Sequence, residues 1–299
     1  MNNKQKVFTV IAAIVIGTTL TWYLQVYRNK QHATKHAKEF IVTIPPVKFI
    51  VHQIVGDDFK ITTLLPEGAS PETYEPTPKQ ISSSSKAEII FATGLIDFEK
   101  TLTDKIAHNT NASIAILSKN IALKEGECTN THARDSQQHN HGIDPHIWTS
   151  VRCLKIMADN AYVNIKALFP DSSKYFDNYL NLIRELDAAD SAVRDLIKES
   201  DIKYFLIYHP ALSYYADDYN ITQVSIEHEG KEPTADHIAS IIKQAKQDSV
   251  HTILYQKQLN QSVVMTAAED IGATPVAFDP LAENVIQNLL WVTETITRR

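Results

Sequence analysis

Four polar residues in this sequence lie just past a predicted strand or just before a predicted helix, at widely separated places: Glu72, His146, His209 and Asp279. In a parallel α/β sheet, ligands bind beyond the carboxyl ends of the strands, so these side chains are the first candidates for a site. Two imidazoles and two carboxylates form a set suited to a divalent transition metal. Each residue also has a structural alternative: a capped histidine after a strand, an aspartate in a turn before Pro280, and a solvated Glu72.

The elements that must position these residues alternate between strand and helix from Phe40 onward. Eight short β-branched or aromatic runs predict strands, and helical apolar spacing separates most of them. The predicted strands are Phe40–Ile44, Phe59–Leu65, Ala87–Thr93, Ala112–Leu117, Tyr204–Tyr208, Thr222–Ile226, Thr252–Tyr255 and Thr274–Phe278. This alternation predicts an α/β fold with two lobes, each holding a four-stranded parallel-type sheet flanked by helices.

A long helical pattern before Ser200 predicts one linking helix between the two lobes. About 27 helical residues would extend near 40 Å. The predicted organisation is a signal or N-terminal membrane anchor and linker over residues 1–39, an N-terminal metal-binding lobe over 40–171, the linking helix over 172–200, and a C-terminal metal-binding lobe over 201–299.

Composition excludes several classes of function. The chain of 299 residues is 43% hydrophobic and 21% charged, as in ordinary globular proteins, and its net charge of −6 argues against a nucleic-acid partner. No glycine-rich nucleotide motif and no nucleophile elbow is present, so the sequence predicts a binding protein, not an enzyme. A zinc hydrolase would need an open coordination position for water, which four protein ligands would close.

The N-terminus predicts a location outside the cytoplasm. An uncharged run from Val7 to Tyr27 lies between lysines 4 and 6 and the basic residues Arg28 and Lys30. Its 21 residues could cross a bilayer core of roughly 30 Å. A cleaved export signal and a retained inner-membrane anchor both fit this pattern, and a buried core helix is a third alternative. The prediction is a periplasmic or extracytoplasmic protein, either free or anchored by residues 7–27.

Five segments together resemble the signature segments of zinc/manganese solute-binding proteins of ABC importers. They occur in order over about Glu39 to Arg299, and they are Leu64–Pro78, Asp144–Trp148, Tyr208–Pro210, Lys231–Pro233 and Asp279–Leu281. The resemblance implies two α/β lobes joined by a rigid helix, with one metal held in the cleft by one residue from each of four loops. The implied ligands are Glu72, His146, His209 and Asp279.

One position departs from the pattern of the family. Most members read Pro-His-x-Tyr-Glu-Pro in the first loop, whereas Glu72 stands in place of the histidine here. A carboxylate still binds Zn²⁺ or Mn²⁺, but it is a harder ligand than imidazole. The histidine at position 209 resembles the zinc-type members, so Zn²⁺ is favoured over Mn²⁺, and Fe²⁺ is a further alternative. Because histidine binds metal as neutral imidazole, affinity is expected to fall below about pH 6.5.

Three further features lie near the predicted site. The segment from His132 to His141 resembles the His-rich loop of zinc-type members, where it could pass metal to the cleft or be a plain hydrophilic insertion. His228 is a candidate auxiliary ligand. Cys128 and Cys153 could pair across the loop in an oxidising compartment, or remain two thiols.

The resemblance implies capture of a divalent transition metal and its delivery to the permease of a metal ABC importer. The expected molecule is a monomer, with contact to the membrane only if the N-terminal segment is retained. A metal-binding surface adhesin or sensor without a cognate importer is the alternative function.

Overall fold

The computed structural model describes residues 39–107, 112–126, 142–227, 235–247, 250–256 and 261–298. The chain divides into two compact units, Met1–Lys38 and Glu39–Arg299, and all the described residues belong to the second unit.

The first sheet has four parallel strands in the order β2-β1-β3-β4. Its strands are β1 (Glu39–Val42), β2 (Lys60–Thr63), β3 (Ile89–Ala92) and β4 (Ser113–Ile116). The helices between them are α2 (Pro45–Val55), η1 (Gly56–Asp58), α3 (Pro78–Ser84) and α4 (Asp97–Ala107). All four residues of β3 are buried, as expected for a strand covered by helices on both faces.

The second sheet repeats the same arrangement, with the strand order β6-β5-β7-β8 and every pair parallel. Its strands are β5 (Tyr204–Ile207), β6 (Thr222–Ser225), β7 (Thr252–Gln256) and β8 (Thr274–Phe278). The helices of this part are α7 (Ser213–Asp218), α8 (Ala235–Gln247), α9 (Gln261–Ile271) and α10 (Val285–Thr297). The two four-stranded parallel sheets confirm the predicted fold class.

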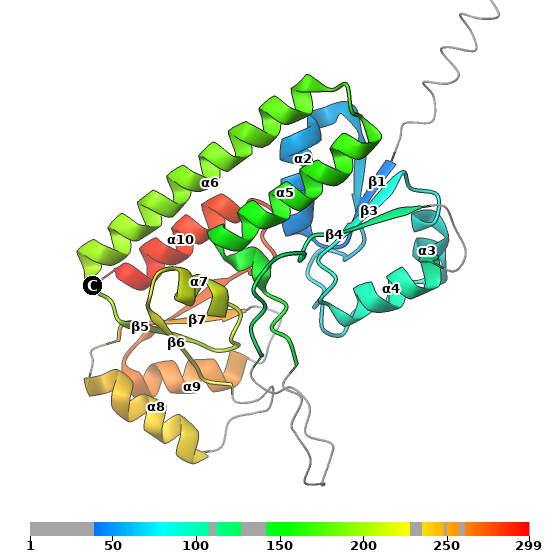
Figure 1. Ribbon diagram of the computed structural model, residues 1–299. Coiled ribbons are helices and arrows are strands. Elements are labelled where there is room, and N and C mark those ends of the chain that lie inside the picture. The colour runs from blue at the N-terminus through cyan, green and yellow to red at the C-terminus, as the bar shows by residue number, and fades with distance from the viewer. Residues whose placement is uncertain are drawn as a thin grey trace, which may run out of the picture. The chain divides into compact units, whose positions relative to one another are not determined.

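The long helix α6 (Ser173–Ser200) carries the chain from the first sheet to the second. Its 28 residues correspond to about 42 Å at 1.5 Å per residue. A buried stripe of Leu182, Leu186, Val193 and Ile197 faces the core. Figure 1 shows α6 lying alongside α5 (Val151–Leu168) and α10, with which it packs. The predicted linking helix is therefore confirmed, whereas the exact domain boundaries stay a prediction.

A single hydrophobic core joins the two sheets. It includes Phe40 and Phe91 from the first sheet, Phe205 from the second, and Leu289 and Val292 from α10. Two smaller clusters lie on the opposite faces of the sheets, one under α3 and α4 and the other under α8 and α9. Each sheet is thus covered on both faces, and one face of each contributes to the shared core.

Helix α7 was not predicted from the sequence. It has only six residues, too few to show an apolar period, and Tyr214, Tyr215 and Ala216 are all buried. Short aromatic segments of this kind are ambiguous between helix, strand and loop. The helix nevertheless matters, because its first turn contacts the loop that carries His146.

Several sequence predictions concern residues outside the described part of the chain. These are the segment 7–27, the His132–His141 loop, Cys128 and His228. Among the helices that the structure describes, none is long and apolar enough to span a membrane. Cys153 is buried in α5 and has no disulfide partner among the described residues, so its pairing with Cys128 stays a prediction.

Candidate metal-binding site

Three of the four predicted ligands come together between the two sheets. Glu72 lies in the loop after β2, His146 directly precedes the 3-10 helix η2 (Ile147–Thr149), and His209 follows β5. One ligand atom from each residue lies within 4.8 Å of the others. His146 and His209 are buried, with ring centroids 5.4 Å apart, while half of the Glu72 side chain is exposed.

The loop that carries Glu72 is fixed by contacts to its own start. The Tyr74 hydroxyl donates a hydrogen bond to the carbonyl oxygen of Leu64 at 2.9 Å, and the Gln80 amide donates to the same oxygen at 3.1 Å. The Tyr74 ring also packs edge-on against Phe98. Glu72 therefore projects from a loop anchored on both sides, although its own side chain reaches solvent.

His146 is oriented by Asp144. Its Nδ1 lies 2.8 Å from Oδ1 of Asp144, and the same oxygen accepts the backbone N–H of His146 at 2.9 Å. The Ser213 hydroxyl donates to the other carboxylate oxygen, and the Tyr214 hydroxyl donates to the Asp144 carbonyl at 2.9 Å. A proton on Nδ1 leaves the Nε2 lone pair of His146 available for a metal.

The charge state of Asp144 supports this orientation. Burial alone would raise the pKa of Asp144, but its hydrogen bonds with His146 and Ser213 outweigh burial and lower the pKa below the ordinary value. The carboxyl is therefore ionised at neutral pH, which makes it a strong acceptor for the imidazole N–H.

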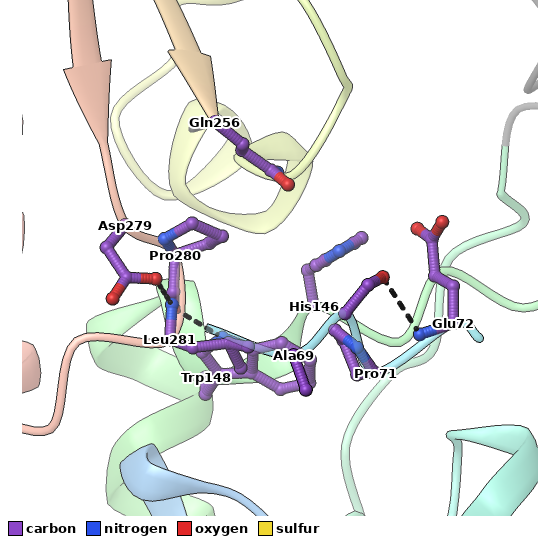
Figure 2. Close-up of a pocket in the computed structure, with 10 residues that line it drawn as sticks. Ala69, Pro71, Glu72, His146, Trp148, Gln256, Asp279, Pro280 and Leu281 are labelled. Carbon is purple, nitrogen blue, oxygen red and sulfur yellow. Dashed lines mark hydrogen bonds between the residues drawn. The ribbon is translucent and has the colours of Figure 1, made fainter. Parts of the chain in front are cut away.

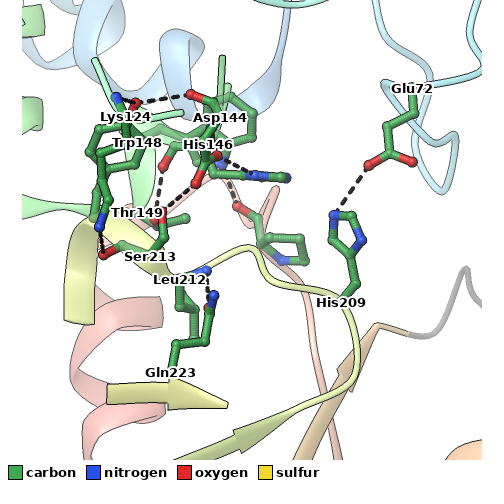
Figure 3. Close-up of polar contacts among 12 residues, drawn as sticks. Glu72, Lys124, Asp144, His146, Trp148, Thr149, His209, Leu212, Ser213 and Gln223 are labelled. Atoms are coloured by element: carbon green, nitrogen blue, oxygen red, sulfur yellow. Dashed lines mark hydrogen bonds and ion pairs between the residues drawn. The ribbon is translucent and has the colours of Figure 1, made fainter. Parts of the chain in front are cut away.

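His209 lies between two carboxylates, as Figure 3 shows in part. Its Nδ1 is 2.9 Å from Oε2 of Glu227, and its Nε2 is 3.2 Å from Oε1 of Glu72. Burial alone would lower the pKa of His209, but Glu227 and Glu72 outweigh it and raise the pKa to about 10. Contact with His209 in turn lowers the pKa of Glu72, against the effect of burial.

The Nε2 atom of His209 is buried and makes no well-aligned hydrogen bond. Its contact with Glu72 at 3.2 Å is an ion pair without hydrogen-bond alignment, which is uncommon for a buried polar atom. This atom faces Glu72 and His146, which together offer an oxygen and a nitrogen donor. A divalent metal bound by all three residues would satisfy it.

Asp279 lines the same small cavity but lies outside the three-residue cluster. Its Oδ1 accepts the backbone N–H of Leu281 at 2.9 Å, which closes a turn before Pro280. Figure 2 shows its carboxylate across the cavity from Glu72 and directed away from His146. The structural alternative for Asp279, a turn residue, therefore describes the metal-free geometry, and its role as a ligand stays a prediction.

Contacts between the halves of the chain hold these loops in place. The indole N–H of Trp148 donates to the carbonyl of Pro280 at 2.8 Å, and Lys48 pairs with Glu283 at 2.8 Å. Both contacts fix the loop after β8, and the first ties it to the segment that carries His146. Asp279 is thus kept beside the cluster even though its carboxylate is turned away.

The spacing of the cluster suits zinc. Metal–ligand distances of about 2.0 Å in a tetrahedral site place neighbouring ligand atoms roughly 3.3 Å apart. The contact of 3.2 Å between Glu72 and His209 already has this separation, and all three ligand atoms lie within 4.8 Å of one another. The adjoining cavity of about 20 Å³ has room for one water molecule or one ion.

Sequence reasoning missed three residues around this site: Asp144, Glu227 and Gln256. Asp144 lies two positions before His146 in a segment that already attracted attention, so an acceptor for the imidazole could have been sought there. Glu227 and Gln256 lie at the carboxyl ends of β6 and β7. Their proximity to the site depends on the strand order, which the sequence does not show.

Replacement of Asp144 by asparagine is expected to weaken zinc binding about tenfold. The amide can no longer present an ionised acceptor to Nδ1 of His146, and loss of such an orienting partner typically costs 10- to 100-fold in metal affinity. Competition titration against a zinc chelator measures the effect. Asp159→Asn, on α5 away from the cluster, is the matched control, and equal affinities of both variants would contradict the role of Asp144.

Comparison with known proteins connects this geometry to a family. The family model for ZnuA, the periplasmic component A of the zinc-uptake complex, matches residues 41–297. Among curated proteins, the zinc-binding protein AdcA of Streptococcus pyogenes is 25% identical over 296 residues, covering 93% of this chain and 56% of AdcA. The high-affinity zinc uptake system protein ZnuA of Bacillus subtilis is 28% identical over 239 residues, covering 78% of this chain and 75% of that protein. The chain therefore spans little more than half the length of AdcA.

Solved structures agree with these similarities. A crystal structure of ZnuA has a TM-score of 0.78 and 29% identity, covering 87% of this chain and 98% of that chain. A zinc-bound deletion mutant of ZnuA has a TM-score of 0.77 and 30% identity, covering 87% of this chain and 97% of that chain. The resemblance found in the sequence segments thus extends over both sheets.

Proposed function

Since the chain belongs to the ZnuA family, the periplasmic component A of zinc-uptake complexes, we propose that it captures Zn²⁺ outside the cytoplasm for an importer. The observation that carries this proposal is the cluster of Glu72, His146 and His209, whose ligand atoms lie within 4.8 Å of one another. The buried Nε2 of His209 lies inside this cluster, makes no well-aligned hydrogen bond, and offers its lone pair to a cation once the imidazole is neutral.

We propose that Asp279 completes the coordination as the fourth ligand. Its carboxylate leaves the turn with Leu281 and rotates into the cavity that it already lines. Two neutral imidazoles, two carboxylates and a dication sum to zero formal charge, which favours a stable buried complex. Four protein ligands leave no open position for a reacting water, so the site is suited to capture and release without catalysis.

Zinc is proposed as the cargo in preference to manganese or iron. Two imidazole nitrogens among four ligands suit Zn²⁺, whereas Mn²⁺ prefers sites richer in oxygen. The curated relatives AdcA and ZnuA are named as zinc proteins.

The proposed partner is the permease of a metal ABC importer, which would receive the ion from a monomeric binding protein. The proposed location is periplasmic or extracytoplasmic, either free or held at the inner membrane by residues 7–27. The ligand cluster includes loops that follow β2 of the first sheet and β5 of the second.

Metal titration tests the function directly. Protein purified without chelator is expected to contain one equivalent of zinc, and in competition Zn²⁺ should displace Mn²⁺. Glu72→His should bind Zn²⁺ with a still greater preference over Mn²⁺, because imidazole is softer than carboxylate. Failure of the parent protein to bind any zinc in a titration would reject the proposed function.

A further inference from the structure

Gln256 at the end of β7 has a buried amide nitrogen with no hydrogen-bond partner. Among the described residues this is one of very few buried side-chain polar atoms in such a state, and another is the Nε2 of His209. Both atoms lie at the same site: Gln256 lines the cavity together with Glu72, His146 and Asp279. A buried donor without an acceptor is unfavourable, so a second state of the site that supplies an acceptor would be stabilised by it.

The strand register places Gln256 beside the segment that carries Asp279. Gln256 is the direct neighbour of Phe278 in the parallel pairing of β7 and β8, and Asp279 is the next residue after Phe278. Figure 2 shows Gln256 extending over the cavity, with Asp279 and Pro280 on one side and His146 on the other. In the metal-free geometry, Oδ1 of Asp279 accepts from Leu281, and no described residue donates to its Oδ2.

We propose that Gln256 is a positioning residue that sets the metal preference of the site, an inference that rests on the proposed function. When the Asp279 carboxylate turns into the cavity, one oxygen binds the metal and the Gln256 amide donates a hydrogen bond to the other. The carboxylate that leaves its turn thereby keeps a hydrogen-bond donor, and the amide gains the acceptor that it lacks.

This hydrogen bond restricts how Asp279 can bind. An oxygen that accepts a hydrogen bond from the amide is held away from the metal, so the carboxylate remains monodentate. With Glu72, His146 and His209, the metal then has four ligands, the number that Zn²⁺ prefers in closed sites. Without the donor, both oxygens can bind, and a higher coordination number richer in oxygen favours Mn²⁺.

The neutral charge of the Gln256 side chain also suits this role. Glutamine supplies a donor without adding a charge beside Glu72 and Asp279. A glutamate here would place a third carboxylate at the cavity and would offer no donor when ionised. The amide is thus the group that can hold Asp279 in place without altering the net charge of the bound site.

The test compares the full-length parent with Gln256→Leu, which keeps the volume and removes the donor. Zinc and manganese affinities are measured by chelator competition, and the coordination number is measured by X-ray absorption on the metal-loaded proteins. In Gln256→Leu the ratio of zinc to manganese affinity is expected to fall at least tenfold, and the zinc coordination number to rise from four to five. Gln244→Leu, at an exposed position on α8, is the control and should match the parent.

A double-mutant cycle separates this role from a merely structural one. In an Asp279→Ala background, Gln256→Leu should have no further effect on either metal, because the acceptor is gone. An unchanged affinity ratio and coordination number in Gln256→Leu, or an equal loss with and without the Asp279 carboxylate, would overturn the inference while leaving zinc binding by the parent intact. Absence of zinc binding by the parent would instead reject the proposed function itself.

Discussion

Replacement of His209 by alanine is expected to weaken zinc binding by a factor of about 10³. Closed zinc sites bind with about 10–16 kcal/mol, so each of four ligands accounts for about 2.5–4 kcal/mol, or about two to three powers of ten. His209 is buried, contacts Glu72 at 3.2 Å and is oriented by Glu227, so no neighbouring group can take its place without rearrangement. His146→Ala is expected to have an effect of the same size.

Isothermal titration with a competing chelator measures this loss. His52→Ala is the matched control, because His52 is a half-exposed histidine on α2 that pairs with Asp57. Removal of residues 132–141 is expected to cost far less affinity than either ligand variant. If His209→Ala binds zinc as tightly as the parent, another donor must complete the site, and His228 is the first to examine.

Zinc affinity is expected to increase about tenfold for each unit of pH between pH 6 and pH 8. The pKa of His209 is raised to about 10 in the metal-free protein, so this imidazole is protonated throughout that range. Zinc binds only neutral imidazole, and each binding event therefore releases the His209 proton. An ordinary histidine pKa would have confined this effect to pH values below about 6.5, so Glu72 and Glu227 move the pH-sensitive range upward.

Proton release can be measured by titration calorimetry in buffers that differ in ionisation enthalpy. About one proton per zinc is expected from His209 at pH 7.5. Glu227→Gln removes one of the two carboxylates that raise the pKa, so its affinity should depend less steeply on pH. An affinity independent of pH between 7 and 8 in the parent would contradict a protonated His209.

The raised pKa of His209 also makes the stability of the fold depend on pH, and stability falls with rising pH where zinc affinity increases. Because the folded pKa of His209 lies above its ordinary value of 6.5, the protonated imidazole stabilises the fold fully below pH 6.5. This contribution declines as the pH rises toward about 10. Metal-free protein thus loses stability over the range in which zinc binding becomes stronger.

Much of the architecture could be predicted from local sequence patterns. Most of the strands are short runs rich in β-branched or aromatic residues, and α6 has an unbroken apolar stripe, so these elements carry their own signals. Helix α7 lacks such a signal because it is short and its buried face is made of tyrosines. Its position is decided by tertiary contacts, including the bond from Tyr214 to Asp144.

The site was predictable only in part, for a related reason. Glu72, His146 and His209 each stand directly in a loop segment with a recognisable pattern. The partner that orients His209 depends on strand order, which no local pattern contains: Glu227 reaches His209 because β6 lies next to β5. The orientation of the Asp279 carboxylate depends on its side-chain rotamer, which the amino-acid type alone does not determine.

The shared hydrophobic core has a consequence for how the chain folds as it is made. Leu289, Val292 and Ile296 of α10 complete a core that also contains Phe40 and Phe205. Part of the shared core therefore stays exposed until α10 packs against α6. Contacts of such long sequence separation make folding slow, and a slowly folding chain remains longer in the unfolded state that an export channel can thread.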